Sequence, residues 1–146
     1  LTGEENLKFI ARMFGLDRIK ERIETAAEMI GVTDRLHQRI GTLSHGMKKR
    51  FSIARALLNN PLILLMDEPE SGLDQEALNL LENVISDHTT SFRTVVTTTH
   101  NLERGLALGN HMAILSSGRI AYQESLDSVE VSKIKDTYFH YTGRHR

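Results

Sequence analysis

The stretch LILLMDEPESGLD, residues 62–74, points to the fold of this chain. It begins with a continuous apolar run, Leu62 to Met66, which is typical of a parallel strand buried on both faces. The run ends in two adjacent carboxylates, Asp67 and Glu68, and Pro69 then prevents the strand from continuing. In open α/β sheets ligands bind beyond the carboxyl ends of the strands, so the two acids mark a candidate site.

Each of these acids has a chemical role that suits its place. A strand-end aspartate can hold Mg²⁺, directly or through water, which makes Asp67 a candidate metal ligand. The adjacent Glu68 can polarise a water molecule as a general base. The plainer interpretation is a solvated acidic turn after a core strand, and this stretch by itself leaves both interpretations open.

A second strand-like segment ends in a similar way. Residues 94–98, TVVTT, are β-branched, and His100 follows them closely. A lone histidine is usually structural or exposed. At a strand end beside a phosphate site, however, an imidazole can donate a hydrogen bond to a terminal phosphate oxygen. His100 is therefore a candidate site residue.

The stretch GTLSHGMKKR, residues 41–50, comes close to a phosphate-binding loop but does not match it. That loop has the pattern G-x-x-x-x-G-K-[ST] after a strand, whereas here Gly46 is followed by Met47 and the preceding segment is not strand-like. What remains is a serine and a glycine before a helix, whose free backbone N–H groups form an anion site. Ser44 could cap that helix or donate its hydroxyl to a phosphate.

Apolar residues at helical spacing predict helices in both halves of the chain. The predicted helices cover residues 4–14, 17–30, 47–58, 75–87 and 102–108, with a short helix or turn at 34–38 and a helical tail after 125. Thr2 and Glu5 have the spacing of a capping box, and residues 112–123 read as a hairpin around Ser117 and Gly118. Strands that alternate with helices predict a parallel sheet in an α/β layer fold.

The composition is that of a globular domain that is large enough to bury a hydrophobic core. The chain has 146 residues, of which 40% are hydrophobic, and its net charge is −1. The absence of cysteine excludes disulfides and thiolate zinc sites, and the balanced charge argues against nucleic acid as the main partner. No apolar run approaches the roughly 20 residues that span a bilayer.

Taken together, these segments resemble the ATP-binding cassette (ABC) family of ATPases. LSHGM at 43–47 resembles the family signature, LILLMDEP resembles Walker B with its following glutamate, SGLD at 71–74 resembles the D-loop, and the strand ending at His100 resembles the H-loop. The resemblance covers nearly the whole chain. It implies an α/β P-loop NTPase of ABC ATPase type, present as a partial domain with parallel core strands and flanking helices. Residues 1–60 would be a helical subdomain with the signature, and 61–146 the second half of the ATPase core.

The resemblance also implies roles for individual residues. In this family two such domains hold two molecules of ATP between them, head to tail, and the signature of one domain binds the terminal phosphate of the ATP held mainly by the other. Asp67 would organise Mg²⁺, Glu68 would be the general base, and His100 would contact the γ-phosphate. Asp74 would communicate across the interface between the two domains. The residues of the signature that would bind ATP are Ser44, His45, Gly46 and Met47.

Three departures from the family pattern accompany this resemblance. His45 stands where the signature has its first glycine, so its side chain could crowd the phosphate or add a donor. Met47 replaces the usual glutamine. The 146 residues also contain no Walker A loop, no aromatic adenine-stacking loop and no Q-loop glutamine, which in the family lie upstream. Because the chain opens at LTGEENLKF without methionine, we expect it to be part of something longer. Because the Walker A lysine and backbone cradle that supply most of the phosphate affinity are missing, we expect the chain to bind Mg·ATP poorly and to hydrolyse it negligibly by itself.

Within the family, the resemblance favours the ATPase subunit of a membrane transporter. Such a subunit would pair with a second ATPase subunit and a transmembrane permease on the cytoplasmic side of the cell membrane. LTGEENLKFIARMFG resembles exporters, while SHGMKKR, DEPESGLD and TTTHNLERGLALGN are similar to haem-exporter ATPases of cytochrome c maturation. Two alternatives stay open: a soluble ABC protein that acts on ribosomes or DNA, and a non-catalytic interaction module.

Overall fold

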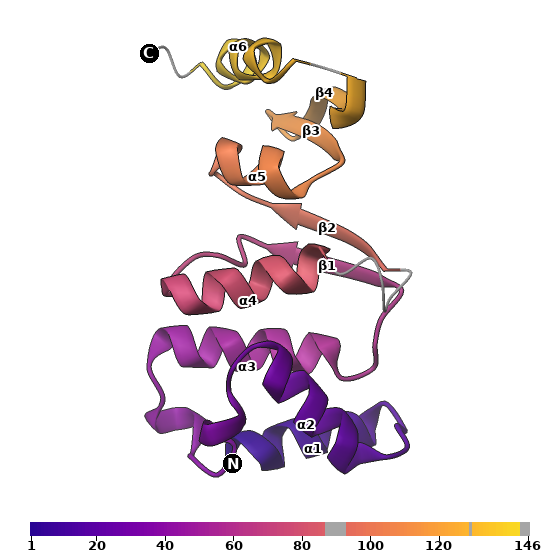
Figure 1. The fold of residues 1–146 in the computed structure, drawn as a ribbon, viewed down its shortest axis with the longest axis vertical. Helices are drawn as coiled ribbons and strands as arrows, with labels where there is room; N and C mark the ends of the chain where they lie inside the picture. Colours follow the sequence, from indigo (N-terminus) through magenta and orange to yellow (C-terminus); the bar gives the residue numbers. More distant parts are fainter. Residues whose placement is uncertain (87–92, 129, 144–146) are drawn as a thin grey trace. The chain divides into compact units, whose positions relative to one another are not determined.

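The computed structural model describes residues 1–86, 93–128 and 130–143. The chain divides into two compact units, Leu1–Thr98 and Thr99–Arg146. Figure 1 shows the helices and strands along the chain. The first unit contains α1 (Gly3–Met13), α2 (Ile19–Met29), α3 (His45–Leu57), β1 (Ile63–Asp67), α4 (Gln75–Ser86) and β2 (Thr94–Thr98), with 3₁₀ turns at Thr33–Arg35 and Ile40–Thr42. The predicted boundary at residue 60, between a helical subdomain and the second half of the ATPase core, is based on motifs and not on compactness. It stays a prediction.

The first helix begins at the capping box that the sequence predicts. The Thr2 hydroxyl accepts a hydrogen bond from the Glu5 backbone N–H at 3.2 Å, and the Glu5 carboxylate accepts one from the Thr2 N–H at 2.8 Å. The two contacts satisfy donors that every helix start leaves without an intrahelical partner. Gly15, at φ +64°, takes the left-handed conformation that ends the helical segment.

The core of the first unit forms where α1, α2 and α3 bury their apolar faces against one another. A Cβ atom on Gly3 would overlap the Phe51 ring, so α1 approaches α3 too closely for any larger residue there. The same cluster continues to β1 and α4, which joins the helices to the strands. Its largest fully buried side chains are Phe51, Leu7, Ile30, Leu58 and Val32.

The two strands of the first unit run parallel, in a register that pairs Ile63 with Thr94 and Asp67 with Thr98. The expectation that the first strand is buried on both faces is wrong within the described residues. Leu64 is buried, but Ile63 is 65% exposed and Leu65 is 72% exposed. The reason is that the helices of this unit cover one side of the strand pair, the side on which Leu64 joins the core (Figure 1).

The second unit contains α5 (Leu102–Leu108), β3 (His111–Ser116), β4 (Arg119–Ser125), a 3₁₀ turn at Leu126–Ser128, and α6 (Val131–Thr142). β3 and β4 form an antiparallel hairpin, and Ser117 and Gly118 both have positive φ in the connecting turn. This confirms the predicted hairpin and its turn. α6 packs on β3, where the Ser116 hydroxyl donates to the Tyr141 carbonyl at 3.1 Å.

Most predicted helices are confirmed to within a few residues. α3 begins at His45, two residues earlier than predicted, and Ser44 caps it, a role that the sequence suggested for this residue. The helix predicted for residues 75–87 is α4, and Asp87 lies outside the described residues. Among the helices that the structure describes, none is both long and apolar enough to cross a membrane.

Candidate functional site

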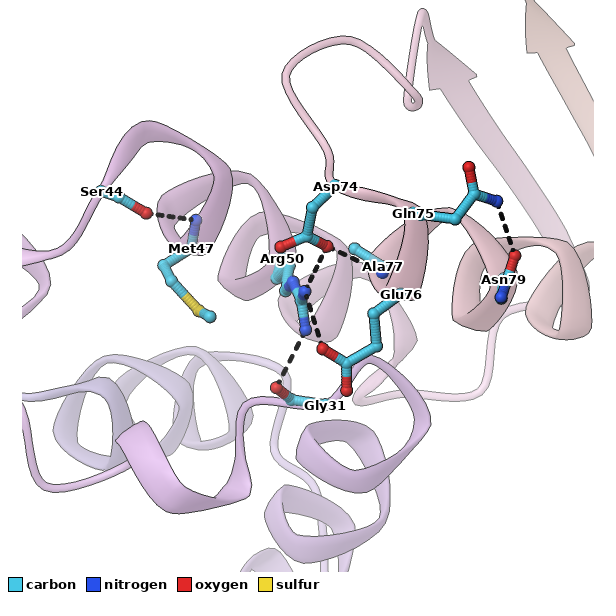
Figure 2. Close-up of polar contacts among 9 residues, drawn as sticks. All are labelled: Gly31, Ser44, Met47, Arg50, Asp74, Gln75, Glu76, Ala77 and Asn79. Carbon is cyan, nitrogen blue, oxygen red and sulfur yellow. Dashed lines mark hydrogen bonds and ion pairs between the residues drawn. The ribbon is translucent and has the colours of Figure 1, made fainter.

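The signature segment forms a capped helix start. The Ser44 hydroxyl accepts a hydrogen bond from the Met47 backbone N–H at 3.2 Å (Figure 2). Ser44 and His45 are exposed, and Gly46 and Met47 are half-buried. A hydroxyl has one proton and two lone pairs, so accepting the capping bond leaves its proton free to be donated. The two roles considered for Ser44 are therefore compatible: the structure shows the cap, and phosphate binding stays a prediction.

The two candidate acids lie at the carboxyl end of β1 and share one neighbour, Thr98. The Thr98 hydroxyl donates to the Asp67 carboxylate and accepts from the Glu68 backbone N–H at 3.0 Å. The hydroxyl therefore fixes the Asp67 side chain and the Glu68 backbone at the same time. The parallel register places Thr98 opposite Asp67, so both strands contribute to this end of the sheet.

Glu68 itself turns the chain sharply away from the strand. Its φ is +42°, a left-handed conformation that is unusual for a residue other than glycine. Such a conformation costs on the order of 1–3 kcal/mol and persists where the surrounding structure holds it in place. Here the Thr98 hydroxyl holds its N–H, and the Lys49 ammonium donates to its carbonyl at 3.2 Å. The backbone of this candidate base is thus fixed on both sides.

The signature turn and the 71–74 loop lie against each other within the first unit. A Cβ atom on Gly46 would lie 2.9 Å from the Gly72 carbonyl oxygen. The His45 ring approaches to 3.0 Å from the position that a Cβ atom on Gly72 would take. Gly72 has φ +75°, so a side chain at this position would also strain the backbone. The side chain of His45, a departure from the family signature, therefore packs beside a loop of its own chain.

Arg50 links that loop to the signature helix. It is 2% exposed, and its guanidinium lies 2.5 Å from the Asp74 carboxylate and 3.6 Å from that of Glu76 (Figure 2). A second nitrogen donates to the Gly31 carbonyl at 3.3 Å. Asp74 in turn accepts from the Ala77 backbone N–H at 3.0 Å, which caps the first turn of α4. Asp74 is therefore held by its own chain, and its role across an interface stays a prediction.

The Asp74 contacts predict a dependence of stability on pH. The Ala77 N–H, and after it the Arg50 guanidinium, lower the pKa of the Asp74 carboxyl below its usual value of 3.8. A folded-state pKa below the unfolded one gives stability that is present above the unfolded pKa and is lost as pH falls through the folded pKa. Urea unfolding should therefore show wild type more stable than Asp74→Asn at about pH 7, and the gap should narrow towards about pH 3. A gap that is the same at both pH values would contradict this account.

His100 lies in the second unit, in the turn between Thr99 and α5. Its side chain is exposed. The next residue, Asn101, caps α5 by accepting from the Arg104 N–H at 3.0 Å. Asp67 and Glu68 belong to the first unit, and the proposed phosphate contact of His100 stays a prediction.

Sequence reasoning missed three residues of this site: Thr98, Lys49 and Arg50. Thr98 left a signal that could have been read, because pairing the two predicted strands end to end places their last residues side by side. Lys49 and Arg50 left none, since their partners lie 19 and 24 residues further along the chain. A basic pair in the middle of a helix usually indicates only a solvated face.

The site also fits a magnesium ion that is held partly by the phosphates of a bound nucleotide. Within the described ranges there is no group of three or more His, Asp or Glu side chains that could hold a metal by themselves. Mg²⁺ is usually bound by one or two carboxylates together with substrate phosphates. One oriented aspartate, Asp67, is consistent with that pattern.

Comparisons with known proteins identify relatives of the chain in sequence and in fold. Residues 1–71 match the family model described as ABC transporter. The chain is 35% identical to ABC transporter ATP-binding protein NatA of Bacillus subtilis (strain 168), over 91% of this chain and 55% of NatA. It is 37% identical to Nod factor export ATP-binding protein I of Cupriavidus metallidurans, over 79% of this chain and 39% of that protein.

A solved structure, described as the ATP binding subunit of an ABC transporter, matches with a TM-score of 0.85 and 25% identity. The match covers 97% of this chain and 62% of that one. The fold is therefore the α/β fold of the ABC ATPases, a branch of the P-loop NTPases, as predicted. The chain belongs to the family of ABC transporter ATP-binding proteins. It spans roughly half of the length of NatA, and less of the Nod factor protein.

Proposed function

We propose that this chain supplies the signature turn and the hydrolytic acids of an ATP-hydrolysing subunit of an ABC exporter. The observation that carries the proposal is the Thr98 hydroxyl, which orients Asp67 and Glu68 together at the end of two parallel strands. Export is supported by relatives whose names state it, such as the Nod factor protein and the fluoroquinolones export ATP-binding protein MT2762 of Mycobacterium tuberculosis.

The proposed mechanism assigns one task to each residue. The Asp67 carboxylate holds Mg²⁺, which supplies charge neutralisation at the ATP phosphates when it is bound. The Glu68 carboxylate takes a proton from the attacking water. His100 donates a hydrogen bond to the terminal phosphate, and Asp74 contacts the second subunit.

The signature turn acts on the ATP of a second subunit. Ser44 offers its hydroxyl proton, and the first backbone N–H groups of α3, with the positive end of the helix dipole, face the phosphate. The two subunits work as a head-to-tail pair beside a transmembrane permease on the cytoplasmic side of the membrane. Because the 146 residues contain no G-x-x-x-x-G-K-[ST] loop, we propose that hydrolysis needs a polypeptide that carries one, called below the loop-bearing polypeptide.

A mixing experiment tests the head-to-tail arrangement. Ser44→Arg blocks the signature turn and Glu68→Gln removes the base, so each variant alone, with the loop-bearing polypeptide, should be inactive. An equal mixture should regain about a quarter of wild-type hydrolysis, because half of the pairs are mixed and each mixed pair has one intact site. A mixture as inactive as its components would contradict sites shared between two chains.

Replacing Thr98 by valine should lower Mg·ATP hydrolysis in the same assay by about 10- to 100-fold, the usual effect of losing a group that orients a metal ligand. Valine keeps the β-branched shape, so the strand should be preserved. Thr97→Val, one position earlier on the same strand, is the matched control and should change activity little. Equal activities for the two variants would show that Thr98 does not contribute to hydrolysis.

Haem export is the narrower candidate that the sequence resemblance suggests. The names of relatives mention Nod factor export, fluoroquinolones export and linearmycin resistance, so two of these names support export and none of them mentions haem. Stimulation of hydrolysis by haem, in the chain assembled with its permease and the loop-bearing polypeptide, would support the narrower proposal. An equal rate with and without haem would leave only the broader one.

A further inference from the structure

Consecutive residues of the signature helix hold the two ends of one short loop. Residues 68–74 connect the candidate base to Asp74, the last residue before α4. Lys49 contacts the first residue of this loop and Arg50 contacts the last. Neither residue has a role in the proposed mechanism above.

The Lys49 contact is made to the backbone of Glu68. The half-buried ammonium donates to the Glu68 carbonyl at 3.2 Å, and the same carbonyl accepts from the Ser71 N–H at 3.1 Å. A residue with φ +42° needs surroundings that fix its conformation, and the direction of its carbonyl is part of that conformation. Lys49 therefore acts on the orientation of Glu68 without touching its carboxylate.

The remaining contacts tie the same loop to the same helix. Arg50 pairs with the Asp74 carboxylate at 2.5 Å, and Gly46 lies against the Gly72 carbonyl. The loop thus meets α3 at its first residue, in its middle and at its last residue. Because Ser44 caps α3, the signature turn and the Glu68 backbone are connected through one helix.

We propose that Lys49 is a positioning residue, which holds Glu68 in its productive backbone conformation and ties it to the signature turn of the same chain. This inference rests on the proposed function. In a head-to-tail pair, the signature turn of a chain serves one ATP and its Glu68 serves the other. The contact from α3 therefore gives each ATP site a physical connection to the hydrolytic group of the second site.

The test compares Lys49→Met, Lys49→Arg and Lys48→Met in the chain with the loop-bearing polypeptide. Lys49→Met should lower kcat by about 10-fold while KM for ATP changes by less than about 2-fold, because the contact positions the base rather than the nucleotide. Lys49→Arg keeps a donor and should recover most of kcat. Lys48→Met, on the exposed neighbour, is the matched control and should behave as wild type.

Three results would overturn the inference. Lys49→Met could have the same kcat as Lys48→Met, or its defect could be a change in KM alone. The third result is a kcat of Lys49→Arg as low as that of Lys49→Met. Amide exchange in the chain by itself gives a second readout. The Ser71 N–H shares the Glu68 carbonyl and should exchange faster in Lys49→Met, while amides of α1 should be unchanged. The proposed function fails instead if wild type with the loop-bearing polypeptide does not hydrolyse ATP, or if its hydrolysis is unaffected by Glu68→Gln.

Discussion

Glu68→Gln should lower Mg·ATP hydrolysis by about 100- to 10,000-fold, the range that a general base contributes. Glutamine has nearly the same shape as glutamate, but its amide cannot take a proton from water. Two contacts that hold residue 68 use its backbone: Thr98 binds its N–H and Lys49 its carbonyl. Neither contact needs the carboxylate, so both should survive the substitution, which removes the base.

Steady-state hydrolysis with the loop-bearing polypeptide is the measurement. Glu70→Gln makes the same chemical change two residues further along and is the matched control, expected to stay within a few-fold of wild type. If Glu68→Gln retains more than about a tenth of wild-type kcat, then Glu68 is not the general base. The loss of rate would in that case be smaller than the smallest loss expected from removing a general base. A loss of similar size in Glu70→Gln would instead indicate damage to the loop.

Phe51→Ala should lower the free energy of unfolding by about 3–5 kcal/mol, the range for phenylalanine truncations in well-packed cores. Phe51 is 2% exposed and is among the largest fully buried side chains. Its ring lies against Gly3, so it joins α3 to the first helix. Removing the ring leaves a cavity that the helices around it cannot fully close.

Urea unfolding measures this effect, provided that the slope with denaturant concentration is unchanged. The neighbouring Ser52→Ala, at an exposed position of the same helix, should change stability by less than about 0.5 kcal/mol. A destabilisation of Phe51→Ala below about 1 kcal/mol would mean that α1 and α3 do not share the core described here.

The features that the sequence predicts well are those set by neighbouring residues. The capping box of Thr2 and Glu5, the hairpin turn at Ser117 and Gly118, and the helix start at Ser44 each depend on a few adjacent positions. The strand ending at Asp67 is also visible, because its apolar run and its following proline are local. These features were sufficient to identify the family, since its motifs lie at such element ends.

The features that the sequence does not reveal depend on partners far along the chain. Arg50 reads as one more basic residue on a helix, yet it is buried because Asp74 and Gly31 meet it from two other elements. The exposure of Ile63 and Leu65 has a similar origin. An apolar run indicates that a strand suits a core, but which of its faces is covered depends on how many helices pack against it.

The most direct test of the central claim is the rate of Mg·ATP hydrolysis by the 146-residue chain, measured alone and with the loop-bearing polypeptide. We expect negligible hydrolysis by the chain alone. Addition of the loop-bearing polypeptide should produce hydrolysis, and Glu68→Gln should abolish that hydrolysis. Hydrolysis by the chain alone that Glu68→Gln removes would contradict the central claim, and the GTLSHGMKKR segment would then be a primary phosphate site.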